Sequence, residues 1–355
     1  MLSMFNDLMI ESYPSLPESP RAGFWYEVSP EGSTCSEGSP WHGLVRLGTE
    51  NKVVVFFVGG GVSLDEEMSR TNAQRWSFAP TVILQDYIVE QGILSDSPEN
   101  PFLDWTMLVI EYAMGDFHVG TNELCLVDEE NNEQVIYHTG YRNYELFMDE
   151  VLPLIGAPDT VVVTGSSAGG FATALLTDDV MSRIPSATNV TACVDSALLY
   201  YGGWRETARD LWSATDAICE RLTGDNIVLD SLVALRERHA DVKVLFTGST
   251  RDHDLQRYQA YIDTGVMAQE ATHENSELYL ANLRRMCADM QEQVPGIGLY
   301  IWEAGYNPGD GSTQHMIMPA PNCFEPLSGE KSVAEWLYDA VQDDVRSYGL
   351  ELLER

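Results

Sequence analysis

Short apolar runs recur along the chain from residue 53 onward, and they predict strands. Each run is continuous rather than alternating, which is typical of strands buried on both faces of a sheet. The runs span Val53–Val58, Met107–Tyr112, Thr160–Thr164, Val190–Val194, Val242–Phe246 and Gly298–Trp302.

Longer amphipathic stretches separate these runs and predict helices. They span Tyr144–Ile155, Ala168–Arg183, Glu206–Leu222, Glu274–Gln293 and Ser332–Tyr348. The alternation indicates an α/β fold with a mainly parallel central sheet flanked by helices, in which ligands bind at the carboxyl ends of the strands. No internal repeat or low-complexity linker divides the pattern, so residues 51–355 are predicted to form one domain.

Residues 1–50 show a different pattern. They are rich in Pro, Ser and Gly without a sustained period, which predicts an irregular N-terminal arm packed on the body. No run of eighteen apolar residues occurs, so no membrane span is predicted. Met1–Tyr13 has no basic segment and contains Asp7 and Glu11, unlike a secretory signal. This favours a cytoplasmic protein, and the alternative is a secreted protein whose signal has been removed.

The segment Gly165–Gly169 has the pattern G-x-S-x-G and lies between a predicted strand and a predicted helix. In that setting the pattern predicts a sharp turn that presents its central serine, Ser167, as a nucleophile, with Ser166 at the variable position. Small residues are needed on both sides because the turn is tight. The alternative is a Gly/Ser-rich helix start whose hydroxyls only cap the helix.

A nucleophilic serine needs a histidine to take its proton and an acid to orient that histidine. In this fold the chain order is serine, acid, histidine. Asp252 and Asp254 follow the fifth predicted strand, and we favour Asp252 because it lies nearer the strand end; the alternative is that either only caps the next helix. His315, in the loop after the sixth strand, is the one histidine of seven that fits by position.

The triplet Gly59–Gly61 directly follows the first predicted strand. Backbone amides without bulky side chains are suited to stabilising an oxyanion, and we expect Gly61, Val62 and Ala168 to provide them. A Gly triplet also suits a turn or a phosphate-binding loop, but neither of the common nucleotide-binding patterns accompanies it.

These residues belong to a longer series of segments that resembles the pectin acetylesterase family. The matching segments are Cys35–Pro40, Gly59–Gly61, Tyr112–Gly120, His138–Asn143 and Gly165–Gly170. The resemblance implies a single domain of α/β-hydrolase-like fold and a carboxylic ester hydrolase that uses no cofactor or metal. It also implies a triad and an oxyanion hole, formed by Ser167, Asp252 and His315 and by Gly61, Val62 and Ala168.

Further candidates for the pocket wall are Gly60, Asp116, His118 and Asp254. For Asp116 and His118 we favour a structural role, because a carboxylate after a Gly commonly binds the backbone amides of its own turn.

The chain departs from the family at two cysteines. Many relatives have a Trp or Ala and then a Cys after the Gly triplet, where this chain has Val62-Ser63, and a Cys where it has Ala113. The loss fits a reducing compartment. The six cysteines present form no CxxC or Cys/His cluster, which argues against a structural zinc site, and their pairing stays open.

The charge composition limits the kinds of partner and substrate that the protein can bind. The 20 Lys and Arg against 55 Asp and Glu give a net charge of −35, which excludes ordinary nucleic-acid binding. The same charge repels an acidic polysaccharide, so a neutral glycan, lipid or small-molecule acyl ester is favoured as substrate.

Together these features predict a serine hydrolase that removes an acetyl or other short acyl group through an acyl-enzyme. A transacylase or thioesterase would use the same triad, and a catalytically inactive binding protein is a further alternative. The oligomeric state is open.

Overall fold

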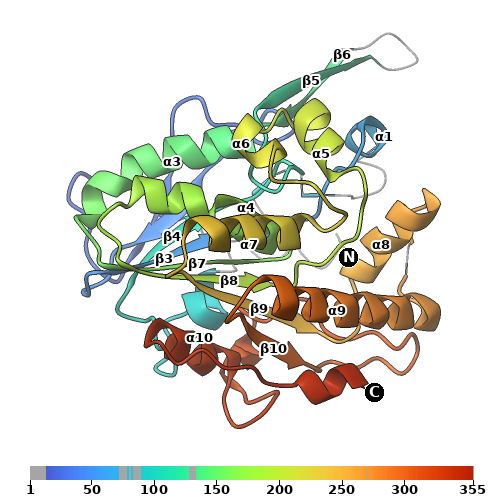
Figure 1. The fold of residues 1–355 in the computed structure, drawn as a ribbon. Helices are drawn as coiled ribbons and strands as arrows, with labels where there is room; N and C mark the ends of the chain where they lie inside the picture. Colours follow the sequence, from blue (N-terminus) through green and yellow to red (C-terminus); the bar gives the residue numbers. More distant parts are fainter. Residues whose placement is uncertain are drawn as a thin grey trace.

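Eight strands form the central sheet in the order β1-β2-β4-β3-β7-β8-β9-β10 (Figure 1). The computed structural model describes residues 13–71, 78–79, 81–82, 89–127, 133–268 and 270–354. The strands are β1 (Trp25–Val28), β2 (Gly43–Arg46), β3 (Lys52–Phe57), β4 (Thr106–Ile110), β7 (Thr160–Ser166), β8 (Asn189–Asp195), β9 (Lys243–Ser249) and β10 (Gly298–Trp302). Six of these strands, β4, β3, β7, β8, β9 and β10, are parallel to one another. β2 is antiparallel to β4, and β1 is antiparallel to β2. The predicted mainly parallel sheet is confirmed.

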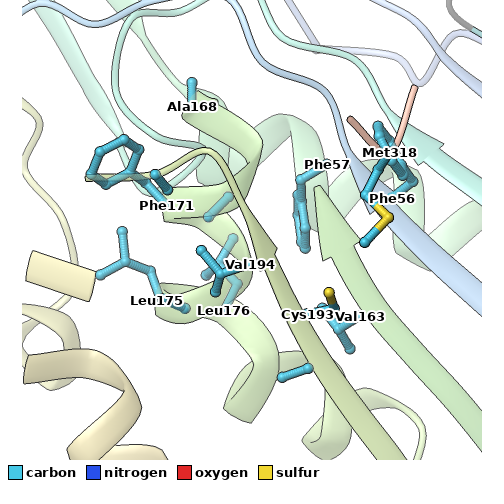
Figure 2. Close-up of a cluster of buried hydrophobic side chains, with 14 of the residues drawn as sticks. Phe56, Phe57, Val163, Ala168, Phe171, Leu175, Leu176, Cys193, Val194 and Met318 are labelled. Atoms are coloured by element: carbon cyan, nitrogen blue, oxygen red, sulfur yellow. The ribbon is translucent and has the colours of Figure 1, made fainter. Parts of the chain in front are cut away.

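Helices cover both faces of this sheet (Figure 1). On one face lie α3 (Gly140–Ile155), α4 (Ala168–Arg183), α7 (Ile227–Arg238) and α9 (His273–Gln293), and on the other α10 (Val333–Val341), η3 (Gly92–Leu94) and η5 (Pro321–Phe324). Successive residues of β3 face opposite sides, as expected for a strand. The ring of Phe57 lies 5.6 Å from that of Tyr144 on α3, and Phe56, Phe57 and Met318 all belong to the buried cluster drawn in Figure 2.

The remaining elements are short. They are α1 (Glu66–Arg70), α5 (Trp204–Glu206), η4 (Thr207–Leu211), α6 (Asp216–Cys219), α8 (Leu255–Thr264), η6 (Leu350–Glu354), and the hairpin strands β5 (Asn122–Val127) and β6 (Glu133–His138). The hairpin projects from the body (Figure 1). No helix in the described part of the chain is both long and apolar enough to cross a membrane.

Two strands lie within the N-terminal segment that was predicted to be irregular. β1 and β2 pair with each other, and β2 pairs with β4, so they extend the central sheet. Each strand has four residues, and Gly43 and Arg46 flank the apolar pair of β2, so neither forms a recognisable run. The prediction of irregular structure is wrong for these residues, while the division into an arm and a domain at residue 50 stays a prediction.

The predicted helix Glu206–Leu222 is interrupted. It consists of a π-helical turn, η4, and the short helix α6, separated by Ser213 with a φ of 51°. The Trp212 indole donates a hydrogen bond to the carbonyl of Ser63 at 2.9 Å, and Thr207 Oγ1 donates one to the carbonyl of Leu64 at 3.0 Å. These tertiary contacts distort the helix, and an apolar period cannot show them.

Candidate active site

Ser167 lies in the turn between β7 and α4, in a strained backbone conformation. Its φ of 57° and ψ of −126° are rarely adopted by a residue with a side chain, and such strain concentrates at functional sites. The turn is held on both sides: the Ser167 amide donates to the Asp195 carbonyl at 3.0 Å, and the Gly170 amide donates to the Ser167 carbonyl at 2.8 Å. The strand, turn and helix predicted around the G-x-S-x-G pattern are therefore present.

Two glycines allow neighbouring backbone to approach this turn. A Cβ on Gly169 would lie 1.8 Å from the Phe57 carbonyl oxygen, and one on Gly59 would lie 2.3 Å from the Ser166 carbonyl oxygen. Any side chain at either position would displace backbone. Glycine at these positions thus lets the end of β3 and the Gly59–Gly61 triplet pack directly against the serine turn.

His315 and Asp252 are hydrogen-bonded to each other. His315 Nδ1 lies 2.7 Å from Asp252 Oδ2, and since a carboxylate oxygen accepts, Nδ1 carries the proton and Nε2 can accept one. Asp252 is fully buried, and its Oδ1 accepts from the amides of Asp254 at 3.0 Å and Leu255 at 2.9 Å. Each oxygen of the carboxylate is therefore engaged, which fixes the direction in which it faces the imidazole.

The loops carrying these two residues are bonded to each other. The His253 amide donates to the Thr313 carbonyl at 3.0 Å, and the Thr313 amide donates to the Arg251 carbonyl at 2.8 Å. This short bridge joins the loop after β9 to the loop after β10, two segments about 60 residues apart in sequence.

Asp254 occupies a different position from Asp252. It is 41% exposed, binds His253 Nδ1 at 3.0 Å and contacts an Arg257 guanidinium nitrogen at 3.5 Å. Partial burial would raise the pKa of Asp254, but the hydrogen bond from His253 and the nearby His315 and Arg257 charges hold it below its usual value. The carboxylate hydrogen-bonded to His315 is thus Asp252, and Asp254 lies on the cavity wall.

A cavity of about 300 Å³ brings the predicted groups together. It is lined by Gly59, Gly60, Gly61, Ser167, Asp254, Arg257, Tyr258, Met267, His315 and Met316. The glycine triplet, Ser167 and His315, which we expected to meet at the carboxyl ends of the strands, all line this cavity. Val62 and Ala168 follow the lining residues Gly61 and Ser167 in sequence and are buried, 2% and 1% exposed.

Asp116 and His118 are not among the described residues that line this cavity. Both are fully buried. Asp116 accepts hydrogen bonds from the amides of His118 at 3.0 Å and Gly140 at 2.8 Å, so its carboxylate fixes backbone. His118 Nε2 donates to the Val58 carbonyl at 2.9 Å, at the start of the glycine triplet. Burial lowers the pKa of His118 to about 4, so this imidazole is neutral and structural.

Tyr112 holds the other end of the triplet. Its hydroxyl donates to the Gly61 carbonyl at 3.0 Å and accepts from the Phe117 amide at 3.0 Å. Because the carbonyl of Gly61 is held in this way, the orientation of the peptide between Gly61 and Val62 is restrained.

The electrostatics of His315 are dominated by carboxylates. Burial alone would lower the pKa of the imidazole, but Asp252 as charge and hydrogen-bond acceptor, followed by Asp254 and Asp195, raises it above its ordinary value. Such surroundings stabilise the imidazolium that forms when the histidine takes a proton.

Two features of the site were not predicted from the sequence. Arg257, Tyr258 and Met267 line the cavity from α8 and the segment after it, a helix that the apolar pattern did not predict. Asp195, at the end of β8, is fully buried and hydrogen-bonded to both the serine turn and the histidine loop. Its position directly after an apolar run was the available signal, since polar groups at such ends face the ligand side of a parallel sheet.

Within the described ranges, no three His, Cys, Asp or Glu side chains are grouped so as to hold a metal ion. All six cysteines, which lie within those ranges, are unpaired with one another.

Comparisons with known proteins give one family model and a similar fold. The family model for pectinacetylesterase matches residues 26–202. The solved structure of the Wnt deacylase Notum from Drosophila is similar to this chain at 16% sequence identity and a TM-score of 0.64, covering 90% of this chain and 94% of Notum. At that identity the likeness shows the fold, and the predicted α/β-hydrolase-like fold is confirmed. A search of curated protein sequences gives no significant match.

Proposed function

Since this chain belongs to the pectinacetylesterase family, a family of carboxylic ester hydrolases, through residues 26–202, we propose that it removes an acetyl or other short acyl group through an acyl-enzyme formed on Ser167. The observation that carries the proposal is the hydrogen bond of 2.7 Å between Asp252 and His315, because His315 lines the same cavity as the strained Ser167.

In the first half of the reaction, Ser167 Oγ attacks the ester carbonyl carbon while His315 Nε2 takes the hydroxyl proton. The tetrahedral intermediate collapses, the imidazolium returns the proton to the departing alcohol, and the acyl group stays on Ser167. Asp252 keeps the proton of the imidazole on Nδ1 and stabilises the positive charge.

In the second half, a water molecule attacks the carbonyl carbon of the acyl-enzyme while His315 Nε2 takes its proton. The bond between the acyl carbon and Ser167 Oγ then breaks, the imidazolium returns the proton to Oγ, and the carboxylic acid is released. The amides of Gly61, Val62 and Ala168 are the proposed donors to the oxyanion of both tetrahedral intermediates. The rigid packing of the glycine triplet against the serine turn supports this role, because donors held in place need no reorganisation during the reaction.

The size and polarity of the cavity support a short acyl group on a neutral substrate. A space of about 300 Å³ is small, and its wall carries the paired charges of Asp254 and Arg257, which a long hydrocarbon chain would leave poorly solvated. The net charge of −35 disfavours a polyanionic substrate.

The proposal is tested with a series of esters of increasing acyl length. We expect hydrolysis to be fastest for acetyl and to fall with length, and Ser167→Ala to lower kcat by at least about 10³-fold while the melting temperature stays unchanged. Ser182→Ala, which alters an exposed serine of α4, is the matched control and should retain full activity. Equal turnover by Ser167→Ala and the wild type would refute the proposal, and transfer of the acyl group to added alcohol would indicate a transacylase.

A further inference from the structure

A single carboxylate oxygen connects the serine turn with the histidine loop. Asp195 Oδ2 accepts hydrogen bonds from Ser166 Oγ at 2.6 Å and from the amides of Ile317 at 3.0 Å and Met318 at 2.9 Å. Ser166 directly precedes the proposed nucleophile, and the two amides follow the proposed base by two and three residues. The distance between nucleophile and base is therefore set in part by a side chain that touches neither.

The backbone around Asp195 is strained in three places. Ser167, Ser196 and Met316 have φ angles of 57°, 51° and 64°. Ser196 Oγ donates to Asp195 Oδ1 at 2.9 Å and accepts from the Met316 amide at 3.2 Å. Strain of about 1–3 kcal/mol at each such residue persists only where the surroundings enforce it. The Asp195 side chain and its neighbour provide that enforcement for both segments.

The hydrogen bonds favour the ionised form of Asp195. Its two oxygens receive four donors, and a protonated carboxyl would have to give up one of them. Burial raises the pKa of Asp195, and the four hydrogen bonds oppose that rise. The titratable groups that face this charge are His315, Cys193 on β8, Tyr279 on α9 and Cys323 on η5.

Resting on the proposed function, we propose that Asp195 is a positioning residue that locks the serine turn and the histidine loop into one reactive geometry. A rigid connection is needed because the proton must pass directly between Ser167 and His315, and a displacement of about 1 Å can lower a rate by about 10²-fold. Ser166, the variable position of the motif, acts with it as the donor on the serine side.

Two variants separate position from charge. Asp195→Ala removes the acceptor for both segments, and we expect kcat to fall by about 10²-fold with little change in KM. Asp195→Asn keeps a side-chain oxygen for the two loop amides but removes the charge. We expect it to recover much of kcat and to move the titration of His315, followed by NMR of histidine-labelled protein, to lower pH.

Asp230→Ala is the matched control, because Asp230 also accepts two backbone hydrogen bonds, from the amides of Thr223 and Gly224 at 2.7 Å, but lies outside the cavity wall. It should lower the melting temperature without changing kcat or the His315 titration. The same behaviour in both Asp195 variants would overturn the inference. If Asp195→Ala does not fold, Asp195→Asn decides through kcat and the titration.

The two proposals can fail separately. An inactive wild type would refute the proposed function, and the His315 titration of Asp195→Asn would still test the connection. The role of Asp195 alone would be refuted by a different set of results. In that set the wild type is active, Ser167→Ala is inactive, and both Asp195 variants keep the wild-type kcat and the wild-type titration of His315.

Discussion

Three carboxylates, those of Asp252, Asp254 and Asp195, act on the imidazole of His315 and raise its pKa. A general base acts only in its neutral form, and these carboxylates stabilise the charged form. The proposed esterase should therefore be nearly inactive at acid pH and gain activity as pH rises through the raised pKa of His315. Its activity profile is expected to rise at a higher pH than an ordinary imidazole would give.

Replacing the two neighbouring aspartates tests which one orients the base. In Asp252→Asn the remaining side-chain oxygen is needed by the amides of Asp254 and Leu255, so an NH2 group faces His315 Nδ1. This favours the wrong tautomer of the imidazole, and we expect the plateau of kcat/KM to fall by about 10³- to 10⁴-fold. Asp254→Asn should keep the plateau within about tenfold and move the midpoint of the profile to lower pH, because only a charge near His315 is lost. The measurement is kcat/KM against pH. A larger loss in Asp254→Asn than in Asp252→Asn would contradict the pairing seen here.

At this scale the sequence supports some predictions and not others. Ser167, Asp252 and His315 were identified because motif and chain order restrict them, and the structure places them around one cavity or directly behind it. Asp195 was not, because its partners lie 29 and 122 residues away in sequence and no motif joins them. Asp116 and His118 were candidates for the pocket wall, but both lie in the protein interior. This agrees with the structural role that a carboxylate after a Gly suggests.

Among the elements, β3, β7 and α4 pack closely against one another through their backbones. The Gly169 Cα faces the Phe57 carbonyl, and Phe57 in turn packs in the buried cluster with Phe171 and Leu175 of α4 (Figure 2). A side chain at residue 169 could not be accommodated by rotating a neighbouring side chain, because the atom that it would meet belongs to the backbone.

Gly169→Ala is expected to destabilise the fold. A Cβ at 1.8 Å from the Phe57 carbonyl oxygen forces β3 and α4 apart, and the free energy of unfolding should fall by about 1–3 kcal/mol or more. Gly202→Ala is the control, because a Cβ there meets no atom within 4 Å. Urea denaturation of both variants and of the wild type gives the comparison. A Gly169→Ala protein as stable as Gly202→Ala would show that the two elements are not in such close contact.

The six predicted strands are confirmed, and the helices Tyr144–Ile155, Ala168–Arg183 and Glu274–Gln293 agree with α3, α4 and α9 at one or both ends. These elements have long or continuous apolar patterns. The elements that were missed, such as β1, β2 and α8, are short or half-exposed, and they are stabilised by partners elsewhere in the chain. The structure also ends α10 at Val341, because Asp343 with a φ of 69° turns the chain, whereas the pattern continued to Tyr348.

For the whole molecule, the net charge of −35 acts over a distance that depends on salt. The Debye length is about 30 Å at 0.01 M salt and about 8 Å at physiological strength. A polyanionic chain approaching the cavity is therefore repelled by much of the protein at low salt and by only its nearest part at higher salt. A neutral chain is not affected in this way.

We expect acetylated neutral xylo-oligosaccharides to be deacetylated faster than acetylated polygalacturonate at low ionic strength, with the difference narrowing as NaCl is added, because screening removes the repulsion. The measurement is kcat/KM for both substrates from about 0.01 to 0.15 M NaCl. The neutral substrate serves as the control for direct effects of salt on the enzyme. Faster turnover of the polyanion at the lowest salt concentration would contradict this expectation.

The wall of the cavity has two origins. The reacting groups and the glycine triplet come from loops at the ends of the sheet strands, which are tied to one another through backbone, whereas Arg257, Tyr258 and Met267 come from α8 and the residues that follow it. The side chains of those three residues take no part in the hydrogen bonds of Ser167, His315 and Asp252 described above. In protein engineering, or in the natural divergence of relatives, α8 is thus the element in which substitutions can change substrate preference while the proposed catalytic residues stay the same.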